Sequence, residues 1–502
     1  MSLPASPLSR RQLLCGVGAA GLTALLPPMA VAATAVVAKT SALAALRPRP
    51  TSAQLAWQRE ELAMFVHFTV NTFTDREWGQ GDESPDLFDP AALDARQWAR
   101  TAKRAGFGSL ILTAKHHDGF CLWPTATTEH SVRSSPWKNG KGDVVREFVD
   151  ACGAEGLGVG LYLSPWDRNA ASYGDSPRYN DFYLAQLTEL LTNYGPLVEL
   201  WFDGANGEGP NGRRQVYDWP RIHATVRRLQ PNAVIFSDTG PDARWIGNET
   251  GAAGATCWAS VDPARVERPG ASEPWVGEAL QQGDPYGSVW RPGESDVSIR
   301  PGWFWHESEN EKARSAEGLL DLYFTSVGRN SKLLLNVPPT RQGLFHERDV
   351  RSLEGFGDLR RRMLAHDAMA GATATASGHE GRRIAAHAMD GDDATWWQAP
   401  KNAREAWIAF DLPEGAEFDV VSLEEAIEEG QHIAQYRVDI WRDGGWSPLT
   451  WGTTIGCRRL HQVPLTRTPR LRVRIEYAYD APRLRRVALL RDPARNRTAT
   501  HG

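Results

Sequence analysis

Two apolar, strand-like runs each end in polar side chains that could do chemistry. Residues 198–204 read Val-Glu-Leu-Trp-Phe-Asp-Gly, so this run stops at the carboxylate of Asp203 beside a glycine. An upstream run, residues 109–114, is followed by Lys-His-His-Asp-Gly-Phe, which contains His116 and His117. In a barrel of parallel strands, the C-terminal ends of the strands open on one face, where catalytic residues gather. The pattern therefore predicts one site that combines a carboxylate nucleophile with imidazoles.

Short apolar runs alternate with helical patterns along the chain, which predicts an α/β fold, a (β/α)8 barrel. The expected strands are residues 63–68, 109–113, 157–163, 198–202, 233–237, 255–258, 302–305 and 333–337. The expected helices are residues 91–104, 143–155, 180–193, 220–229, 311–327 and 348–365. A Pro/Gly-rich excursion, residues 264–295, follows the sixth expected strand, and its composition indicates a long substrate-shaping loop.

The pattern changes after Gly371 to short segments with strict alternation, at residues 406–412, 435–441 and 471–477. This period is typical of an antiparallel β-sandwich. We therefore expect a catalytic domain over residues 50–368 and a C-terminal β-sandwich over residues 371–492.

Residues 389–397 read Met-Asp-Gly-Asp-Asp-Ala-Thr-Trp-Trp, and together with the sandwich pattern they are similar to discoidin-like modules. Asp390, Asp392 and Asp393 in this segment could supply oxygen ligands to a structural calcium ion. Aspartates of this kind also form turns, so both interpretations stay open.

The Trp-x-Asp-Gly motif at Asp203 and the histidine pair, with Phe-Val-His-Phe at 65–68 and Asn-Thr-Phe at 71–73, resemble the retaining α-L-fucosidases of glycoside hydrolase family 29. The resemblance implies exo-acting removal of terminal fucose by double displacement, with no cofactor. It also implies that Asp203 is the nucleophile and that His67, His116 and His117 bind fucose hydroxyls.

A retaining glycosidase needs a second carboxyl group as acid and then base, about 5–5.5 Å from the nucleophile. Glu249 is the first candidate, because we expect it in the loop after strand five, beside strand four. Its segment, residues 244–251, resembles the corresponding loop of the subgroup that cleaves α-1,3 and α-1,4 fucosyl linkages. Glu307 and Glu309, after the expected seventh strand, are the alternatives, and Glu249 would then be a surface residue.

Several aromatic residues are candidates for contact with the apolar side of fucose. Trp78 falls on the loop after strand one, Tyr162 near the end of strand three, and Trp201 two residues before the nucleophile, on the same side of its strand. Trp303 and Trp305 share one face of the expected seventh strand. Packing inside the barrel is the alternative explanation for all of them.

Other functions are weighed against this interpretation. The net charge of −5, with both signs interspersed, gives no indication of nucleic acid as a partner. A metal-dependent hydrolase is disfavoured because the His-His-Asp run lacks the i, i+4 spacing of a helical zinc motif. A broad-specificity α-L-fucosidase and a catalytically inactive, lectin-like fucose-binding barrel are the remaining alternatives, and the expected partner is a fucosylated glycan.

The N-terminus carries a targeting pattern. Residues 9–14 read Ser-Arg-Arg-Gln-Leu-Leu, an apolar stretch runs from Cys15 to Leu26, and Ala-Val-Ala follows at 30–32. This order is typical of a twin-arginine signal peptide. The apolar run is shorter than the roughly 20 residues of a membrane span. We therefore expect a signal over residues 1–33, export to the periplasm or the medium, and no membrane anchor.

Overall fold

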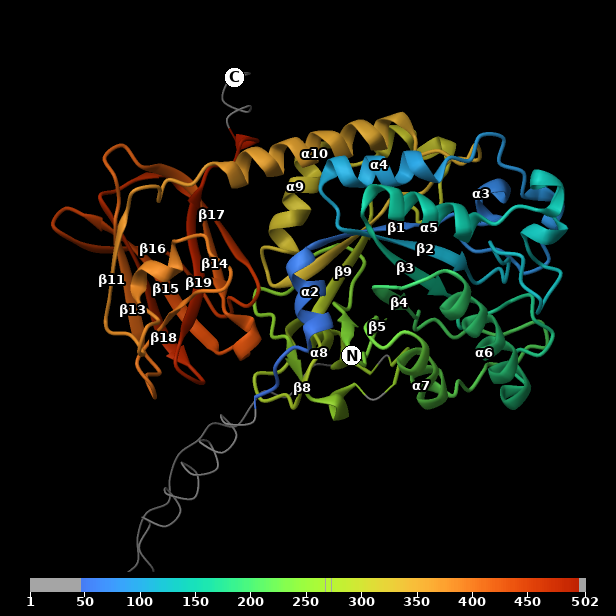
Figure 1. The fold of residues 1–502 in the computed structure, drawn as a ribbon, viewed down its shortest axis with the longest axis horizontal. Helices are drawn as coiled ribbons and strands as arrows, with labels where there is room; N and C mark the ends of the chain where they lie inside the picture. The colour runs from blue at the N-terminus through green and yellow to red at the C-terminus, as the bar shows by residue number, and fades with distance from the viewer. Residues whose placement is uncertain (1–46, 267, 272, 496–502) are drawn as a thin grey trace, which may run out of the picture. The chain divides into compact units, whose positions relative to one another are not determined.

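The computed structural model describes residues 47–266, 268–271 and 273–495, so the expected signal peptide lies outside the described residues. Within that part of the chain, eight parallel strands close into a barrel, which confirms the expected fold class (Figure 1). Around the barrel the strands are β1 (Leu62–Val66), β2 (Ser109–Lys115), β3 (Gly158–Leu163), β4 (Glu199–Trp201), β5 (Val234–Ser237), β6 (Ala243–Trp245), β9 (Gly293–Ser298) and β10 (Ser331–Asn336).

The predicted sixth and seventh strands, residues 255–258 and 302–305, are wrong. The structure has no strand at either segment, and β6 and β9 take these two places in the barrel. β6 follows β5 after a short turn and contains the charged Arg244, while β9 reads Gly-Glu-Ser-Asp-Val-Ser. Neither strand has an apolar pattern. Arg244, Glu294 and Asp296 are nevertheless buried, and each forms a hydrogen bond with a polar partner.

Helices cover the outside of the barrel, and six of them lie close to where they are expected. Two helices, at 52–60 and 276–282, are not predicted by the sequence, and the second interrupts the expected loop at 264–295. The covering helices are α2 (Ser52–Glu60), α4 (Ala95–Ala105), α5 (Val144–Glu155), α6 (Ser176–Asn193), α7 (Trp219–Leu229), α8 (Val276–Gln282), α9 (Ala316–Thr325) and α10 (Glu347–Ala365). The side chains of Asp94 and Asp143 cap the N-termini of α4 and α5, and glycines in the left-handed conformation end both helices. α4 lies against α10 along one side of the barrel (Figure 1).

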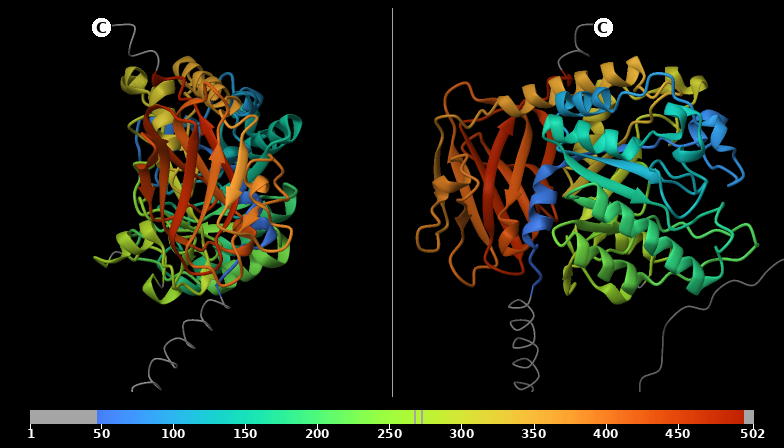
Figure 2. Two further views of the ribbon diagram at one scale, coloured as in Figure 1. Left: turned by 90° about the vertical axis from the view of Figure 1, so that its left-hand side faces the viewer. Right: turned by 45° about the vertical axis from the view of Figure 1, so that its right-hand side comes forward.

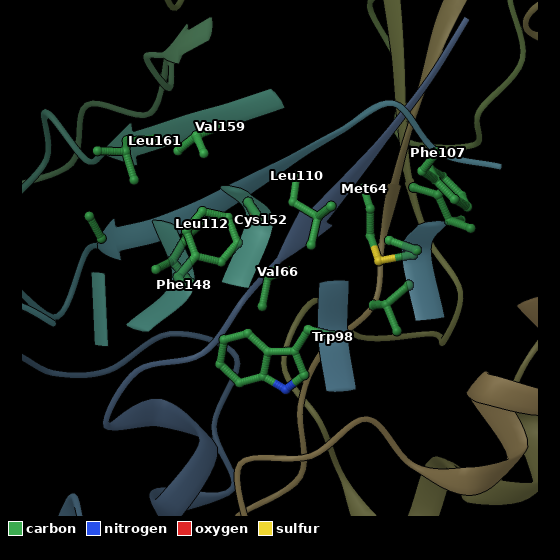
Figure 3. Close-up of a cluster of buried hydrophobic side chains, with 14 of the residues drawn as sticks. Met64, Val66, Trp98, Phe107, Leu110, Leu112, Phe148, Cys152, Val159 and Leu161 are labelled. Carbon is green, nitrogen blue, oxygen red and sulfur yellow. The ribbon is translucent and has the colours of Figure 1, made fainter. Parts of the chain in front are cut away.

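Alternation along the strands divides the barrel core into two layers. Outward-facing residues such as Met64 and Leu110 belong to one core cluster with Trp98 of α4 and with Phe148 and Cys152 of α5 (Figure 3). Inward-facing residues of the neighbouring positions form a second cluster inside the barrel, which holds Phe65, Ile111, Tyr162, Trp201 and Phe236 among others. Because the inner layer is rich in aromatic rings, it forms a rigid floor under the C-terminal ends of the strands.

The C-terminal domain is a sandwich of two antiparallel sheets, as expected. One sheet has the order β11 (Thr373–Ala376), β13 (Ala406–Asp411), β18 (Arg470–Ala478), β15 (Ile433–Arg442) and β16 (Gly445–Gly452). The other has the order β12 (Trp397–Gln398), β19 (Arg483–Leu490), β14 (Glu417–Glu425) and β17 (Arg459–Arg467). Figure 2 shows the strands of this domain in orange and red.

The two sheets use their faces differently. Their inner faces enclose a core of their own, with Trp397, Tyr436 and Val473 among its fully buried residues. Val420, Leu460, Ala488 and Leu490, from the sheet that contains β14, instead join the core cluster of the barrel. That sheet is therefore covered on its outer side by the barrel.

The aspartate segment at 390–393 forms a turn. Asp390 accepts hydrogen bonds from the backbone N–H of Asp392 at 2.9 Å and from the hydroxyl of Thr395 at 2.7 Å. These bonds use both carboxylate oxygens of Asp390, and calcium binding stays a prediction. Among the described helices, none has the length and apolarity that a bilayer span requires.

Candidate active site

The ends of β1 to β4 bring five predicted site residues together. His67 follows β1, His116 and His117 follow β2, Tyr162 stands near the end of β3, and Asp203 follows β4. The ring centroids of His67 and His116 are 5.5 Å apart, those of His116 and His117 4.1 Å, and those of His116 and Tyr162 5.7 Å. The expected clustering of histidines is therefore present.

Both histidines of the pair reach one site because β2 loses its regular register before they occur. The pairing of β2 with β3 shifts between Thr113 and Lys115, and the strand ends at Lys115. Gly119 then turns the chain with φ of +79°, and a Cβ there would come within 2.5 Å of Asp167. Adjacent residues would face opposite ways on a regular strand, so this irregular end is what allows both rings to face the same side.

Asp203 is held by two hydrogen-bond donors and is still partly open to solvent. The hydroxyl of Tyr162 donates to its Oδ2 at 3.2 Å, and the backbone N–H of Ala205 donates to its Oδ1 at 2.6 Å. Nε2 of His117 lies 3.9 Å from Oδ2, and the side chain of Asp203 is 26% exposed. Donors directed at both oxygens hold this carboxylate in a fixed orientation, which a nucleophile requires.

The hydrogen bonds of two histidines fix which ring nitrogen carries the proton. Asn336 donates through Nδ2 to Ser298 and to the carbonyl of Trp303, so its Oδ1 accepts from Nδ1 of His67 at 2.8 Å. Ser164 donates to the carbonyl of Trp166, so its oxygen accepts from Nδ1 of His117 at 2.7 Å. Neutral His67 and His117 therefore keep Nε2 free as an acceptor, which suits the hydroxyl of a sugar.

Burial keeps these imidazoles neutral. It lowers the pKa of His67 to about 3, and burial together with the neighbouring rings lowers the pKa of His116 well below its ordinary value. Burial also lowers the pKa of His117, although the charge of Asp203 opposes this. The cluster thus offers hydrogen bonds without a positive charge. In the described residues, no group of three or more His, Cys, Asp or Glu side chains is placed to hold a metal ion.

Glu249 lies in the loop after β6, one strand later than expected, because the unpredicted β6 intervenes. The indole N–H of Trp303 donates to Oε2 of Glu249 at 3.2 Å. Burial raises the pKa of Glu249, and the nearby charges of Asp203 and Glu77 raise it further. The structure therefore places Glu249 within electrostatic reach of Asp203.

The two other candidate acids have different surroundings. Glu307 is exposed at the start of a 3-10 helix, Glu307–Lys312. Glu309, on the same helix, accepts from the backbone N–H of Gly302 at 3.1 Å.

The predicted aromatic residues divide into exposed and buried members. Trp78 is 55% exposed and stands edge-on to His117 at 5.9 Å and to Trp166 at 5.7 Å. Trp201 is buried in the floor, where it stacks on Phe236 at 4.4 Å and donates to Glu294 at 3.0 Å. Tyr162 connects the buried floor to the open site, because its ring belongs to the floor and its hydroxyl donates to Asp203.

Trp303 and Trp305 do not share the face of a strand, because no strand forms there. Trp303 is 5.2 Å from His67 and donates to Glu249, whereas Trp305 is buried and donates to Asn310 at 3.2 Å. The expectation that they share a face is wrong, and only Trp303 of the two contacts the residues described above.

Comparison with known proteins agrees with this geometry. The family model for α-L-fucosidase matches residues 50–362, and the model for the F5/8 type C domain matches residues 372–470. The chain is 45% identical over 422 residues to alpha-L-fucosidase 1 of Arabidopsis thaliana, which covers 82% of this chain and 81% of that protein. The chain belongs to the α-L-fucosidase family.

Solved structures place this α-L-fucosidase in glycoside hydrolase family 29. A family 29 fucosidase of Ruminococcus gnavus, in complex with fucose, is 33% identical with a TM-score of 0.82, over 89% of this chain and 95% of that chain. A family 29 member from a rumen bacterium is 38% identical with a TM-score of 0.79, over 89% and 78% of the two chains. The protein is thus a glycoside hydrolase.

Two acidic residues near the site are not predicted from the sequence. Asp296, on β9, accepts from the indole of Trp245 at 2.7 Å, and burial together with the charge of Glu249 raises its pKa to about 8. Asp238 follows β5, and its burial raises its pKa to about 7, with Asp203 contributing. Asp296 stands on an unpredicted strand. Asp238 directly follows a predicted one, and that position could have identified it.

A third missed group links the loop after β1 to the segment that carries Trp303. Glu77 accepts from the backbone N–H groups of Trp303 at 2.7 Å and Phe304 at 3.1 Å. His306 bridges Glu77 at 2.6 Å and Asp75 at 2.8 Å. Because these bonds fix the backbone of Trp303, they also position the indole that contacts Glu249.

Proposed function

We propose that this α-L-fucosidase hydrolyses terminal α-L-fucosyl linkages by double displacement, with net retention. Asp203 attacks the anomeric carbon while Glu249 donates a proton to the leaving oxygen. Glu249 then removes a proton from the water that releases fucose. The contrast between the two carboxyl groups supports this assignment: Asp203 receives two donors, whereas burial and the charge of Asp203 raise the pKa of Glu249.

The substrate fucose would be held by neutral hydrogen bonds and ring contacts. Nε2 of His67 and of His117 would accept protons from fucose hydroxyls, and His116, whose Nδ1 is buried without a partner, would bind a third polar group. Trp303, beside His67, would contact the apolar side of the sugar, and the exposed Trp78 would close the rim.

The nucleophile can be tested with Asp203→Gly. The variant should fold but lose turnover of an aryl α-L-fucoside, because the carboxylate is at the mouth of the barrel and not in its core. Added azide should then restore activity and give β-fucosyl azide, whose configuration is read by NMR. Full activity without azide would refute the assignment of Asp203.

We further propose α-1,3- and α-1,4-linked fucose of oligosaccharides or glycoconjugates as the natural substrate. The resemblance of residues 244–251 to the subgroup with this specificity supports the proposal. The excursion at 264–295 reaches the site as well, because the backbone N–H of Gly270 donates to Asp238 at 2.5 Å, beside the glycine that follows Asp203. Hydrolysis rates on a panel of α-1,2-, α-1,3-, α-1,4- and α-1,6-fucosylated oligosaccharides test it, and equal rates would indicate broad specificity.

Export by the twin-arginine pathway is likewise our proposal, supported by the pattern of residues 9–32. Replacement of Arg10 and Arg11 by lysine should leave the precursor in the cytoplasm. Unchanged amounts of exported enzyme, measured by cell fractionation, would show that another route is used.

A further inference from the structure

The sheet of the C-terminal domain that contains β18 carries a row of tryptophans and arginines across its outer face. Trp407 of β13 pairs with Arg474 of β18, Arg474 pairs with Arg437 of β15, and Arg437 pairs with Trp451 of β16. We call these four residues the Trp–Arg row. Directly paired residues point to the same side of a sheet, so the four side chains form one line across four strands.

The outer ends of the row are open to solvent. Trp407 is 37% exposed and Trp451 is 71% exposed, although both rings are large and apolar. Arg437 and Arg474 lie between the two tryptophans, and their side chains are 31% and 41% exposed, respectively. The neighbouring residues on the same strands, such as Ile408, Val438, Val473 and Ile475, are buried in the sandwich core, so the row belongs to the outer face.

Aromatic and guanidinium groups continue beside the row. Trp441 and Trp446 form an edge-to-face pair at 5.3 Å, and the guanidinium of Arg472 lies 4.6 Å from the ring of Trp446. Arg470 contacts both rings, at 5.3 and 5.2 Å. These rings are already covered by arginines, which distinguishes them from the open rings of Trp407 and Trp451.

The charges of the face nearly balance. Arg474 donates to Glu476 at 2.5 Å, and Arg437 lies 3.6 Å from the same carboxylate and 3.1 Å from Asp439. Asp439 also accepts from Arg472 at 2.6 Å. The centre of the row therefore presents fixed donors and fixed acceptors side by side, with little net charge.

The barrel leaves this face free. The domain packs on the barrel through the other sheet, whose Val420, Leu460, Ala488 and Leu490 belong to the core cluster of the barrel. The hydrogen bonds between the two domains come from loops and from β17, as in the bonds of Cys257 to Thr454 and of Cys457 to Asn330. None of the contacts of the row involves a residue of the barrel within the described chain.

We propose that the Trp–Arg row binds a neutral glycan chain, at a site separate from the catalytic barrel. Three strand spacings separate Trp407 from Trp451, about 14 Å in all, which exceeds one sugar ring and fits a short run of sugar units. The two open tryptophans would stack on the apolar faces of rings at the ends of that run. The guanidinium and carboxylate groups between them would exchange hydrogen bonds with hydroxyls, which are both donors and acceptors.

The near balance of charge is what selects a neutral chain over an acidic one. An acidic polysaccharide would need to displace Glu476 and Asp439 from the arginines, or to lie against these carboxylates. A hydroxyl-rich neutral chain can bond to both partners without separating them. Such a site would keep the enzyme on a glycan surface while the barrel acts on fucosyl ends.

Affinity electrophoresis of the full-length protein tests the proposal. The gels contain fucose-free galactomannan, non-fucosylated xyloglucan or mixed-linkage β-glucan as neutral probes, and polygalacturonate as the acidic probe. Because these polymers lack fucose, the catalytic site does not contribute. At least one neutral polymer should retard the protein, and Trp407→Ala/Trp451→Ala should weaken the binding by roughly tenfold or more, since two aromatic contacts are lost.

Matched controls separate binding from folding. Leu465→Ala removes a side chain that is 57% exposed on β17, in the other sheet, and should leave the retardation unchanged. The double tryptophan variant should keep its activity on an aryl fucoside and its thermal midpoint. Four results would overturn the proposal: no retardation by any neutral polymer, retardation that survives the double variant, binding to polygalacturonate alone, or a dimer that the double variant dissociates in sedimentation experiments.

Discussion

Trp303 connects carboxylates that come from distant segments of the chain. Its backbone N–H is fixed by Glu77, and its indole N–H donates to Glu249. That indole bond favours the ionised form of Glu249, whereas burial and the charge of Asp203 favour the protonated form and prevail. The pKa of Glu249 is therefore raised, but less than it would be without the tryptophan.

Trp303→Phe should consequently raise the pKa of Glu249 further. The acid must be protonated in the first step, so activity falls as pH rises through the pKa of Glu249. The alkaline limb of the pH profile of kcat/KM should therefore move to higher pH in the variant. Trp305→Phe is the control, because its indole bonds to Asn310 and should leave the limb in place. A limb that stays fixed or moves to lower pH in Trp303→Phe would contradict this role of the indole.

The acid/base assignment itself predicts a dependence on the leaving group. Glu249→Ala should lose about 10²–10⁴-fold on a fucosylated oligosaccharide, but far less in the first step with an aryl fucoside of an acidic phenol, which departs without protonation. Azide should accelerate that variant and give a product of retained configuration. Glu307→Ala should behave like the unmodified enzyme. If Glu307→Ala instead showed this dependence on the leaving group and this acceleration by azide, Glu307 would be the acid/base residue.

The end of strand β2 depends on a buried charge. Lys115, the last residue of β2, is fully buried and donates to Asp167 at 2.9 Å and to Gln186 at 2.9 Å. Asp167 also accepts from the backbone N–H groups of Asn169 and Ala170. The pair therefore fixes the end of β2 directly before the two histidines.

Lys115→Met should destabilise the fold by about 3–5 kcal/mol, because it leaves the carboxylate of Asp167 buried and unpaired. Urea denaturation measures the loss, and KM for an aryl fucoside should rise if the histidines shift. Lys138→Met, which breaks the exposed pair with Glu147, should cost at most about 1 kcal/mol. Equal effects of the two substitutions would mean that the buried pair does not fix the strand end.

Glu61 joins the barrel to the sandwich. It is buried at the C-terminal end of α2 and accepts from Tyr323 at 2.8 Å, from Arg360 at 2.9 Å and from Arg458 of the sandwich at 2.5 Å. Burial opposes the charge of Glu61, but the two arginines outweigh burial and hold its pKa below the ordinary value. Arg458 also pairs with Glu424 at 2.9 Å, so the junction is a network.

Glu61→Gln should therefore lose stability in a pH-dependent way. A lowered pKa contributes stability that is present above the ordinary carboxyl pKa and is lost as pH falls through the folded value. The difference in unfolding free energy between wild type and variant should be largest near neutral pH and shrink in acid. Glu414→Gln, at an exposed position, should show no comparable difference. If the difference in unfolding free energy between wild type and Glu61→Gln grew as the pH fell, the predicted direction would be wrong.

Local sequence patterns were enough to predict the barrel class, the sandwich and the strand-end position of Asp203. These features rest on local patterns, since strand and helix periods and a carboxylate at a strand end are visible within a few neighbouring residues. The histidine pair was found for the same reason, because it directly follows an apolar, strand-like run.

By contrast, β6, β9 and the neighbours of the proposed acid became apparent only in the folded chain. Arg244 can be buried because the carbonyl of Leu280 accepts from it at 2.7 Å, and Asp296 because Trp245 donates to it at 2.7 Å. Trp303 and Trp305 look alike in sequence, yet one reaches Glu249 and the other Asn310. A polar side chain can be buried only where a distant segment supplies its partner, and no local pattern records which segment that is.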